Sequence, residues 1–417
     1  MTIARVIDGI CRAESARVLS GLIGRFRDFD LAEDALQDAF ARALEIWPAQ
    51  GLPKVPAAWL ATVARRRALD LLRRRRTGPV YTDEPPDVAA PASDNDEPEP
   101  DPAAHSGVDD DRLRLLFTCC HPAIGKPAQM ALALRTLCGL STREIARAFL
   151  EPEATTAQRL VRVKKKIVDA GIPYEVPSRE ALPERLRTVL GVVYLVFNEG
   201  YATTGHDGLI RPDLSSEAIR LARLVATLMP DEPEALGLLA LMLLHDSRRA
   251  TRVGTDGALV PLEEQDRCRW NGAAIEEGRR VLDTALAMRR RGPYQVQAAI
   301  AALHAGAATA EDTDWPQIAA LYGGLLREQP GAVVELNAAV AVAMAEGPER
   351  GLECLVRLDG SPELAGYHLL PAARADLLRR LGRYAEAATA YEAALALVKN
   401  RAERLYLERR LAACRVP

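Results

Sequence analysis

Arginine and lysine side chains gather in two short stretches, and their grouping indicates contact with a polyanion. The first stretch holds Arg65-Arg66-Arg67 and Arg73-Arg74-Arg75-Arg76, and the second holds Arg159, Arg162 and Lys164-Lys165-Lys166. Guanidinium groups pair with phosphates and with the edge of guanine, so both stretches are candidate nucleic-acid contacts. The alternative for each is a solvated, charged helix face, which is the ordinary role of such runs.

An acidic strip separates the two basic stretches. Residues 78–111 contain eleven Asp and Glu and no Lys or Arg. Residues 1–77 hold 14 Lys and Arg against 9 Asp and Glu, and residues 112–177 hold 11 against 5. The pattern predicts two basic modules joined by an acidic tether. Because the strip is rich in proline and has no apolar periodicity, we expect it to be disordered when free.

Cys119, Cys120 and His121 invite a metal or redox interpretation, since all three residue types bind metal ions. Consecutive residues of a helix cannot all point at one ion, and no second cluster supplies the remaining ligands of a tetrahedral site. We therefore expect buried thiols that serve packing, and neither a metal nor another cofactor.

Four polar residues further along could form a catalytic cluster: Asn198, Glu199, Asp266 and Arg267. No nucleophile and base at a recognisable spacing accompany them. A buried polar network that fixes helix packing is the better interpretation, so we do not expect an enzyme.

Amphipathic helices must position the first basic stretch. Apolar residues recur every three or four positions from Leu31 to Leu44, with Asp30 as the predicted N-cap and Glu33 as its capping partner. Prolines and a glycine predict a loop over 48–56. A second helix follows, and Trp59 on it is either a core residue or a ring that stacks on an unpaired base.

The second basic stretch lies in a helix-turn-helix pattern. Ser141 precedes Glu144 by three residues, the spacing of a capping box, and a turn containing Pro152 follows. The last helix is expected from about Thr155 to Asp169. It buries an apolar stripe and exposes polar and basic residues, the shape of a DNA-reading helix. The alternative is a basic, solvated helix of an ordinary helical domain.

Residues 178–417 predict an array of five to six helical hairpins. The clearest helix, Leu381–Leu397, spaces small and aromatic residues as tetratricopeptide repeats do. These residues are Gly382, Tyr384, Ala387, Tyr391 and Ala394. Segments 314–328 and 332–346 form another expected pair. Such arrays bind partners more often than they catalyse.

Composition agrees with an all-α fold, since alanine, leucine and arginine dominate. Seven irregularly spaced cysteines without a CxxC favour a reducing cytoplasm over a disulfide framework. No signal peptide is visible. The longest apolar run, Ala235–Leu244, is about half of the ~20 residues that a membrane span needs. We therefore expect a cytoplasmic protein with no membrane partner.

Three segments occur in an order and spacing that resemble the group IV, extracytoplasmic-function sigma factors of bacterial RNA polymerase. They are LAEDALQDAF at 31–40, WLATVARRRALDLLRR at 59–74 and LSTREIARAFL at 140–150. The first two are similar to sigma region 2 and the third to region 4. Other segments are similar to the subgroup with a long tetratricopeptide-like C-terminal extension. These are FTCCHP at 117–122, YLVFNEGY at 194–201, QDRCRW at 265–270 and TDW at 313–315.

The resemblance implies four parts and two partners. Residues 1–77 would be region 2, 78–111 a linker, 112–177 the helix-turn-helix of region 4, and 178–417 the extension. The implied partners are core RNA polymerase and promoter DNA, with a protein partner or an intramolecular contact for the extension. The implied function is transcription initiation at −10/−35 promoters, with a regulatory role for the extension.

The resemblance also assigns residues. The stretch that docks on polymerase would include Asp34, Gln37 and Asp38. The residues that read and melt the −10 element would include Trp59, Arg65, Arg66, Arg73 and Arg74. The loop 48–56 would capture an extruded base. The residues in the −35 major groove would include Thr155, Thr156, Gln158, Arg159, Arg162 and Lys165.

Other functions stay open at this point. A helical scaffold or adaptor, whose N-terminal modules make protein contacts only, is the main alternative, and an enzyme sited in 180–320 is another. The acidic strip is either a mimic of nucleic acid inside polymerase or a solvated tether.

Overall fold

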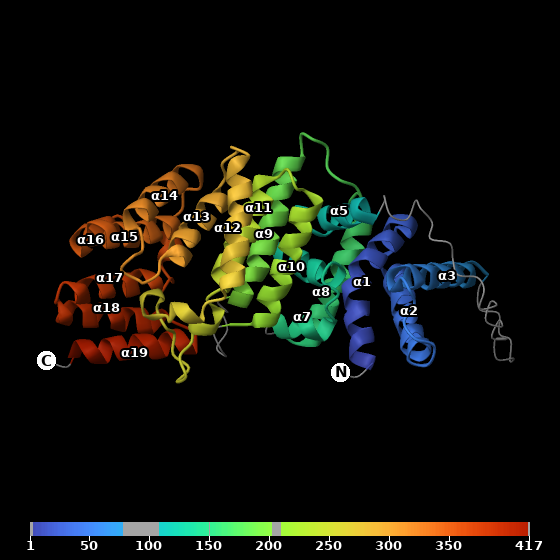
Figure 1. The fold of residues 1–417 in the computed structure, drawn as a ribbon, viewed down its shortest axis with the longest axis horizontal. Helices are drawn as coiled ribbons and strands as arrows, with labels where there is room; N and C mark the ends of the chain where they lie inside the picture. The colour runs from blue at the N-terminus through green and yellow to red at the C-terminus, as the bar shows by residue number, and fades with distance from the viewer. Residues whose placement is uncertain (1–2, 78–107, 150, 202–209, 416–417) are drawn as a thin grey trace. The chain divides into compact units, whose positions relative to one another are not determined.

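The computed structural model describes residues 3–77, 108–149, 151–201 and 210–415. Over these residues the fold is all-α, as expected, and the one pairing of extended backbone is a single bridge between Val253 and Leu259 (Figure 1). The chain divides into two compact units, Met1–Val193 and Tyr194–Pro417. Most of the acidic strip lies outside the described residues. Its last four residues, 108–111, already belong to a helix, so the predicted linker is too long at this end.

The first unit packs one helix, α1, against both basic modules. α1 contacts α2 and α3 as well as α5 and α6, while α6, α7 and α8 pack on one another. The bounds are α1 Ile3–Phe26, α2 Phe29–Gln50, α3 Pro56–Thr77, α5 Val108–Cys119, α6 Lys126–Thr136, α7 Thr142–Ala148 and α8 Glu153–Asp169. Helix α9, Leu182–Tyr201, begins in this unit.

Both ends of α2 differ from the prediction. Its N-cap is Asp28, whose Oδ1 accepts a hydrogen bond from the Leu31 N–H at 2.9 Å, so Asp30 lies in the first turn instead. The helix also continues through Pro48 to Gln50, and the connecting loop is shorter than 48–56. A proline so close to the helix end removes only one of the last hydrogen bonds. Gly51, at a φ of 88°, closes the turn by donating to the Trp47 carbonyl.

Two consecutive helices, α7 and α8, lie where the helix-turn-helix was predicted. Ser141 caps α7, and both halves of the capping box with Glu144 are present. The second helix starts two residues earlier than predicted, at Glu153. Its buried side chains are Thr156, Leu160, Val163 and Ile167, three of which form the predicted apolar stripe.

The second unit is a succession of helices in which neighbours in sequence pack on each other. The bounds are α10 Pro212–Leu228, α11 Pro233–Asp246, α12 Gly272–Ala287, α13 Pro293–Gly306, α14 Trp315–Glu328, α15 Ala332–Glu346, α16 Pro348–Val356, α17 Leu369–Arg380, α18 Tyr384–Leu397 and α19 Arg401–Arg415. Short 3₁₀ turns lie between α11 and α12 and between α16 and α17: η1 Arg249–Thr251, η2 Leu262–Glu264, η3 Arg267–Arg269 and η4 Pro362–Leu364. The predicted pair 314–328 and 332–346 corresponds to α14 and α15.

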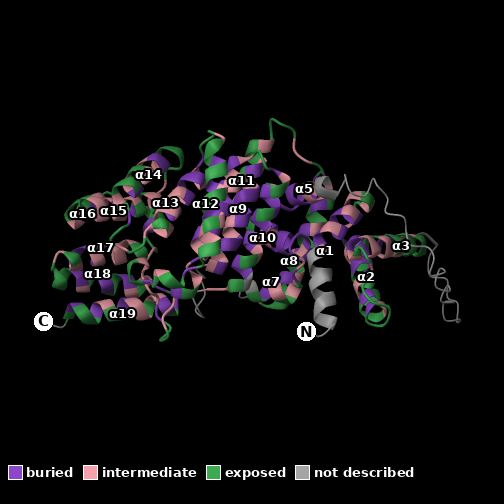
Figure 2. Ribbon diagram, in the orientation of Figure 1, coloured by how far each residue is buried: buried purple, intermediate pink, exposed green. Residues whose placement is uncertain are grey.

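Helix α11 forms the centre of one core in this unit. Ten of its fourteen residues are buried, including most of the apolar run Ala235–Leu244 (Figure 2). Helices α12 and α13 pack against it. Gly237 lets α13 approach closely, because a Cβ there would lie 2.8 Å from the Gln295 nitrogen. Burial among neighbouring helices thus accounts for the apolar run Ala235–Leu244.

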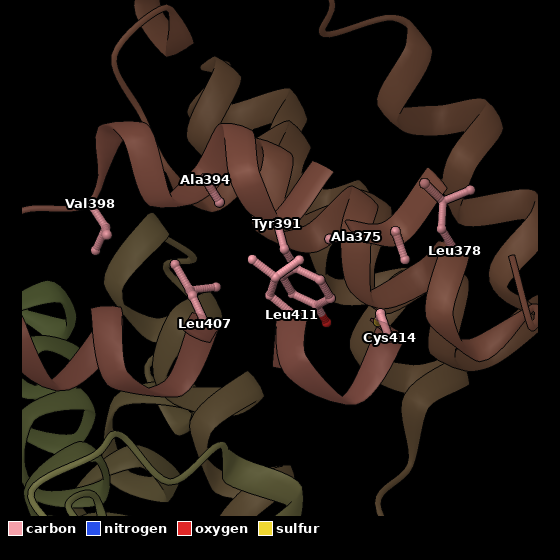
Figure 3. Packing of buried hydrophobic residues seen from close by; sticks show 9 residues of the cluster. Ala375, Leu378, Tyr391, Ala394, Val398, Leu407, Leu411 and Cys414 are labelled. Carbon is pink, nitrogen blue, oxygen red and sulfur yellow. The ribbon is translucent and has the colours of Figure 1, made fainter. Parts of the chain in front are cut away.

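Helices α17, α18 and α19 share another core, built on the side chains that suggested a repeat. Tyr391 and Ala394 of α18 are buried between the neighbouring helices (Figure 3), and Ala387 belongs to the same buried cluster. The predicted helix over 381–397 starts too early. Gly382, at a φ of 72°, lies in the turn after α17, and α18 begins at Tyr384. The left-handed conformation of this glycine ends the preceding helix.

Candidate nucleic-acid interface

Helices α2 and α3 hold each other through a pair of tryptophans and two ion pairs. Trp47 is buried, and Trp59 lies edge-on against it with ring centroids 5.3 Å apart. Arg67 pairs with Asp38 at 2.5 Å, and Arg75 pairs with the capping residue Asp28 at 2.9 Å. Trp59 is half-buried, so it contributes to packing and keeps part of its ring accessible.

Other arginines of α3 are exposed to solvent. Four side chains from the predicted −10 set are exposed: Arg65, Arg66, Arg73 and Arg74. Arg73 has a loose contact of 3.6 Å with Asp70, whose own side chain is about half exposed. The other side of α3 faces the core, because Leu60, Ala64 and Ala68 are buried. The sequence pattern thus concentrates positive charge along one accessible side of α3, suited to a polyanion.

The outer face of α2 carries the candidate polymerase contacts. Asp34, Gln37 and Asp38 are all exposed. Asp38 is also engaged by Arg67, so α3 restrains its orientation. Asp34 and Gln37 lie one turn apart on the helix and form one polar surface.

Helix α8 presents a polar face opposite its buried stripe. The exposed members of the predicted −35 set are Thr155, Gln158, Arg162 and Lys165. Arg162 donates a hydrogen bond to the Gln158 side chain at 3.0 Å, so two groups that recognise base edges stand together. A hollow lined by Arg159, Arg162 and Lys166 of α8 and by Gly125 and Ala128 at the start of α6 lies beside this face.

Two of the predicted −35 residues have internal roles. Thr156 is fully buried, and its hydroxyl donates to Glu151 at 2.5 Å. Arg159 is half-buried and donates to both carboxylate oxygens of Glu151, at 2.7 Å for the Nη2 bond. Burial would raise the pKa of Glu151, but the hydrogen bonds from Arg159 and Thr156 hold it below its ordinary value.

Glu151 was missed by the sequence analysis. The only signal was an acidic residue directly before Pro152, at the start of the second helix. From this position Glu151 holds α8 against the loop that precedes it. Its partners, Thr156 and Arg159, lie about one helical turn apart on α8. Charged groups that are partly buried need such partners.

The two basic modules also contact each other. Lys164 of α8 lies 2.9 Å from Asp30 and 3.0 Å from Glu33 of α2. Arg135 of α6 lies 3.3 Å from Glu33 on its other oxygen. No sequence signal pointed to this cluster, since its members are more than a hundred residues apart.

Family models match two segments of the chain. Residues 12–77 match the family model described as sigma-70 region 2. Residues 185–286 match a family of unknown function, DUF6596. An uncharacterized protein of Rhizobium meliloti (strain 1021) is 46% identical over 396 residues, which cover 95% of this chain and 92% of that protein. The chain belongs to one family with this rhizobial protein.

The segment that matches sigma-70 region 2 contains every residue of the candidate polymerase and −10 sets. Its match ends at the last residue of α3 and spans the Trp47–Trp59 contact. Domains of this type act in polymerase binding and transcription initiation, and the sigma factor family is not a family of enzymes. None of the helices among the described residues is long and apolar enough to cross a membrane.

The cysteine pair at the end of α5 is buried. Cys119 and Cys120 have almost no exposed surface, and Cys119 contacts the Thr136 hydroxyl at 3.3 Å. Burial raises the pKa of the Cys119 thiol to about 12, which keeps it protonated and unreactive. Among the residues that the structure describes, no three His, Cys, Asp or Glu side chains gather as a metal site.

The polar residues of the second unit hold loops in place. Arg267 donates to the carbonyls of His304 and Ala307, at 2.5 and 3.0 Å, and its guanidinium stacks on Trp270. Asp266 caps the short η3 turn by accepting from the Cys268 N–H. Arg267 thus makes structural contacts, but Asp266 is exposed and does not belong to the expected buried network. Asn198 and Glu199 are half-buried on α9.

Acid is expected to destabilise the second unit through His304. Burial, aided by Arg248 and Arg267, lowers the pKa of His304 to about 4. The unfolded chain takes up this proton near pH 6.5, so stability falls as pH drops from 6.5 to 4, by at most about 1.4 kcal/mol per pH unit. Scanning calorimetry of the wild type and of His304→Gln between pH 7.5 and 4.5 measures this. The variant should lose less in Tm over that range, and equal losses would contradict the assignment.

Proposed function

We propose that the chain is a sigma factor that binds bacterial core RNA polymerase and directs initiation at −10/−35 promoters. The observation that carries this proposal is the sigma-70 region 2 domain, whose α3 exposes a row of arginines. The helix-turn-helix of α7 and α8, with its capping box, supports a second DNA contact. The spacing of the two modules along the chain favours the group IV, extracytoplasmic-function class.

Each exposed surface then has a role. The face with Asp34 and Gln37 would dock on polymerase, with Asp38 at its edge. The exposed arginines of α3 and the accessible edge of Trp59 would hold and melt the −10 element. Gln158 and Arg162 would read bases of the −35 element, with Thr155 and Lys165 beside them. Thr156 and Arg159 would keep α8 in place through Glu151.

Reconstitution with core polymerase on a promoter library tests the proposal. We expect initiation that depends on short sequence elements near −10 and −35 and an affinity for DNA that falls with salt. Sequence-independent activity no greater than that of core polymerase alone would reject it. That outcome would favour the alternative, a helical scaffold or adaptor, for which the hairpins of the second unit are the supporting observation.

Arg162→Ala is expected to relax −35 recognition by about 1–3 kcal/mol per base pair that Arg162 reads, because a bidentate guanidinium contact distinguishes guanine from other bases. Selection of promoters from a randomised −35 library, compared with the wild type, measures the effect. Arg179→Ala removes the same charge from an exposed position outside α8 and should leave the preference unchanged. A uniform loss of affinity across all sequences would show that Arg162 contacts phosphate instead.

We propose that the second unit regulates this initiation function. Its helices pack as consecutive hairpins, with a shared core in α17–α19 that resembles tetratricopeptide repeats. Such arrays present extended surfaces for protein contacts. A protein partner, or an intramolecular contact with the DNA-binding modules, is the expected binding event.

A further inference from the structure

A cavity in the second unit brings together two segments to which the initiation function gives no role, QDRCRW at 265–270 and TDW at 313–315. Its volume is about 540 Å³. Arg267 and Thr313 lie 46 residues apart in sequence, and the Arg267 Nη2 donates a hydrogen bond to the Thr313 hydroxyl at 3.4 Å. Both side chains line the cavity, as does Trp315. The two segments therefore build one site.

Much of the cavity wall is apolar. The side chains that form this part are Trp315 of α14, Val340 and Met344 of α15, and Leu377 of α17. Leu377 is buried and the other three are half-buried, so this surface is sheltered but open to a ligand from solvent. Cavities of about 300–1,000 Å³ with apolar walls and a few polar groups are the usual sites of small organic molecules.

Most of the charged groups around the cavity neutralise one another. Arg380 of α17 donates to Glu263 and to Asp376, at 2.7 Å in each case. Arg379 also pairs with Asp376, at 2.6 Å. Glu311 lines the cavity as well, but it is exposed, so water weakens the effect of its charge. These groups together leave little net charge to select a ligand.

Arg267 is the exception, because its guanidinium contacts only neutral oxygen atoms. Both Nη1 hydrogen bonds go to backbone carbonyls, of His304 and Ala307, and the Nη2 bond goes to the Thr313 hydroxyl. Among the described residues it has no ion pair, and three of its five N–H groups are used. Nε and Nη2 form one edge of the guanidinium, the edge that matches the two oxygens of a carboxylate.

His304 lies beside this guanidinium and lines the same cavity. Its ring packs edge-on against Trp315, with centroids 5.1 Å apart. Its Nδ1 atom is buried and has no hydrogen-bond partner among the described residues, which points to a partner from outside the chain. Burial, and then the charges of Arg248 and Arg267, lower the pKa of His304 to about 4. The positive potential that disfavours its protonation favours a bound anion.

We propose that the cavity binds a small organic carboxylate with an apolar body. The carboxylate pairs with the Nε–Nη2 edge of Arg267, and the body packs on Trp315, Val340 and Met344. The volume of the cavity fits such a ligand. The inference concerns the second unit alone and does not rest on the initiation function.

Calorimetric titration of the full chain with β-naphthoate tests the preference for a carboxylate, with β-naphthamide as the neutral compound of the same shape. We expect the naphthoate to bind about 10-fold to 100-fold more tightly, because the amide loses the charge-assisted contact with Arg267. Equal affinities of the two compounds, or no binding of either, would overturn the inference.

Two arginines of the η3 turn form a matched pair for the charge. Arg267 lines the cavity, whereas Arg269 is exposed and does not. Arg267→Gln should abolish the preference for naphthoate over naphthamide, and Arg269→Gln should keep it. The same preference in both variants would contradict the role of Arg267.

A second pair of variants leaves Arg267 unchanged, since its contacts with carbonyls also hold a loop. Val340→Trp fills part of the cavity from α15, and Val333→Trp places the same ring at a position of that helix that is 42% exposed. We expect only the first to weaken naphthoate binding, by about 10-fold or more, with thermal unfolding as the check that both variants are folded. Unchanged affinity in a folded Val340→Trp would place the probe elsewhere and reject the site.

The binding site and the initiation function can fail separately. A chain that binds naphthoate in this cavity but never initiates transcription keeps the site and rejects the sigma function. A chain that initiates at −10/−35 promoters but does not distinguish naphthoate from naphthamide keeps the function and rejects the site.

Discussion

Neutralising the four exposed arginines of α3 with glutamine is expected to weaken binding to DNA by about three orders of magnitude at 0.1 M salt. The positions are Arg65, Arg66, Arg73 and Arg74. Each phosphate contact releases about 0.7–0.9 of a condensed counterion, so the slope of log affinity against log salt should become shallower by about three. Glutamine keeps the length and much of the helix propensity of arginine, which separates the loss of charge from unfolding.

Fluorescence anisotropy with a labelled DNA of any sequence, titrated at several salt concentrations, measures this slope, since phosphate contacts carry no sequence information. Arg67→Gln with Arg75→Gln provides the comparison on the same helix, because both side chains are paired with carboxylates of α2. That double variant should change the slope by less than half as much. A shallower slope in the paired variant than in the exposed one would place the DNA on another face of α3.

Tyr391→Ala is expected to destabilise the second unit by about 3–5 kcal/mol. The ring is 1% exposed and packs between α17 and α19, against Ala375 and Leu411 among others (Figure 3). Truncating a buried aromatic side chain leaves a cavity that its neighbours fill only in part. Because an array transmits stability mainly between adjacent helices, the loss should concentrate in α17–α19.

Chemical denaturation and hydrogen exchange of the full chain measure this loss and its location. Tyr384→Ala is the matched control on the same helix, since Tyr384 is 53% exposed and exposed substitutions change stability by about 0.5 kcal/mol or less. The amides of α17–α19 should exchange faster in the first variant only. Equal effects of both substitutions would mean that the repeat-like spacing of α18 does not define its core.

Elements with several local signals in agreement could be predicted from sequence. Helices α14 and α15 start and end within one residue of expectation, because each carries an apolar stripe and a proline or glycine lies at its boundary. The capping box of Ser141 placed α7 for the same reason. These signals act within one helical turn, so they do not depend on the rest of the fold.

The predicted helix boundaries were wrong where two local signals competed. Asp28 and Asp30 could each cap α2, and the buried side chain of Phe29 belongs to the helix only if Asp28 is the cap. Pro48 was expected to end the helix, yet it fits in the last turn. Gly382 was placed inside a helix because its neighbours match a repeat, although its φ of 72° belongs to a turn.

By itself, the sequence determined the helical class, the two basic modules and which faces of α3 and α8 carry charge, since periodicity and composition are local properties. Only the tertiary structure decided which of those charges remain accessible. Arg159 and Lys164 have the same sequence character as Arg162, but Glu151 engages the first and α2 the second. An ion pair forms wherever packing brings opposite charges together, and packing between residues a hundred positions apart leaves no trace in local sequence.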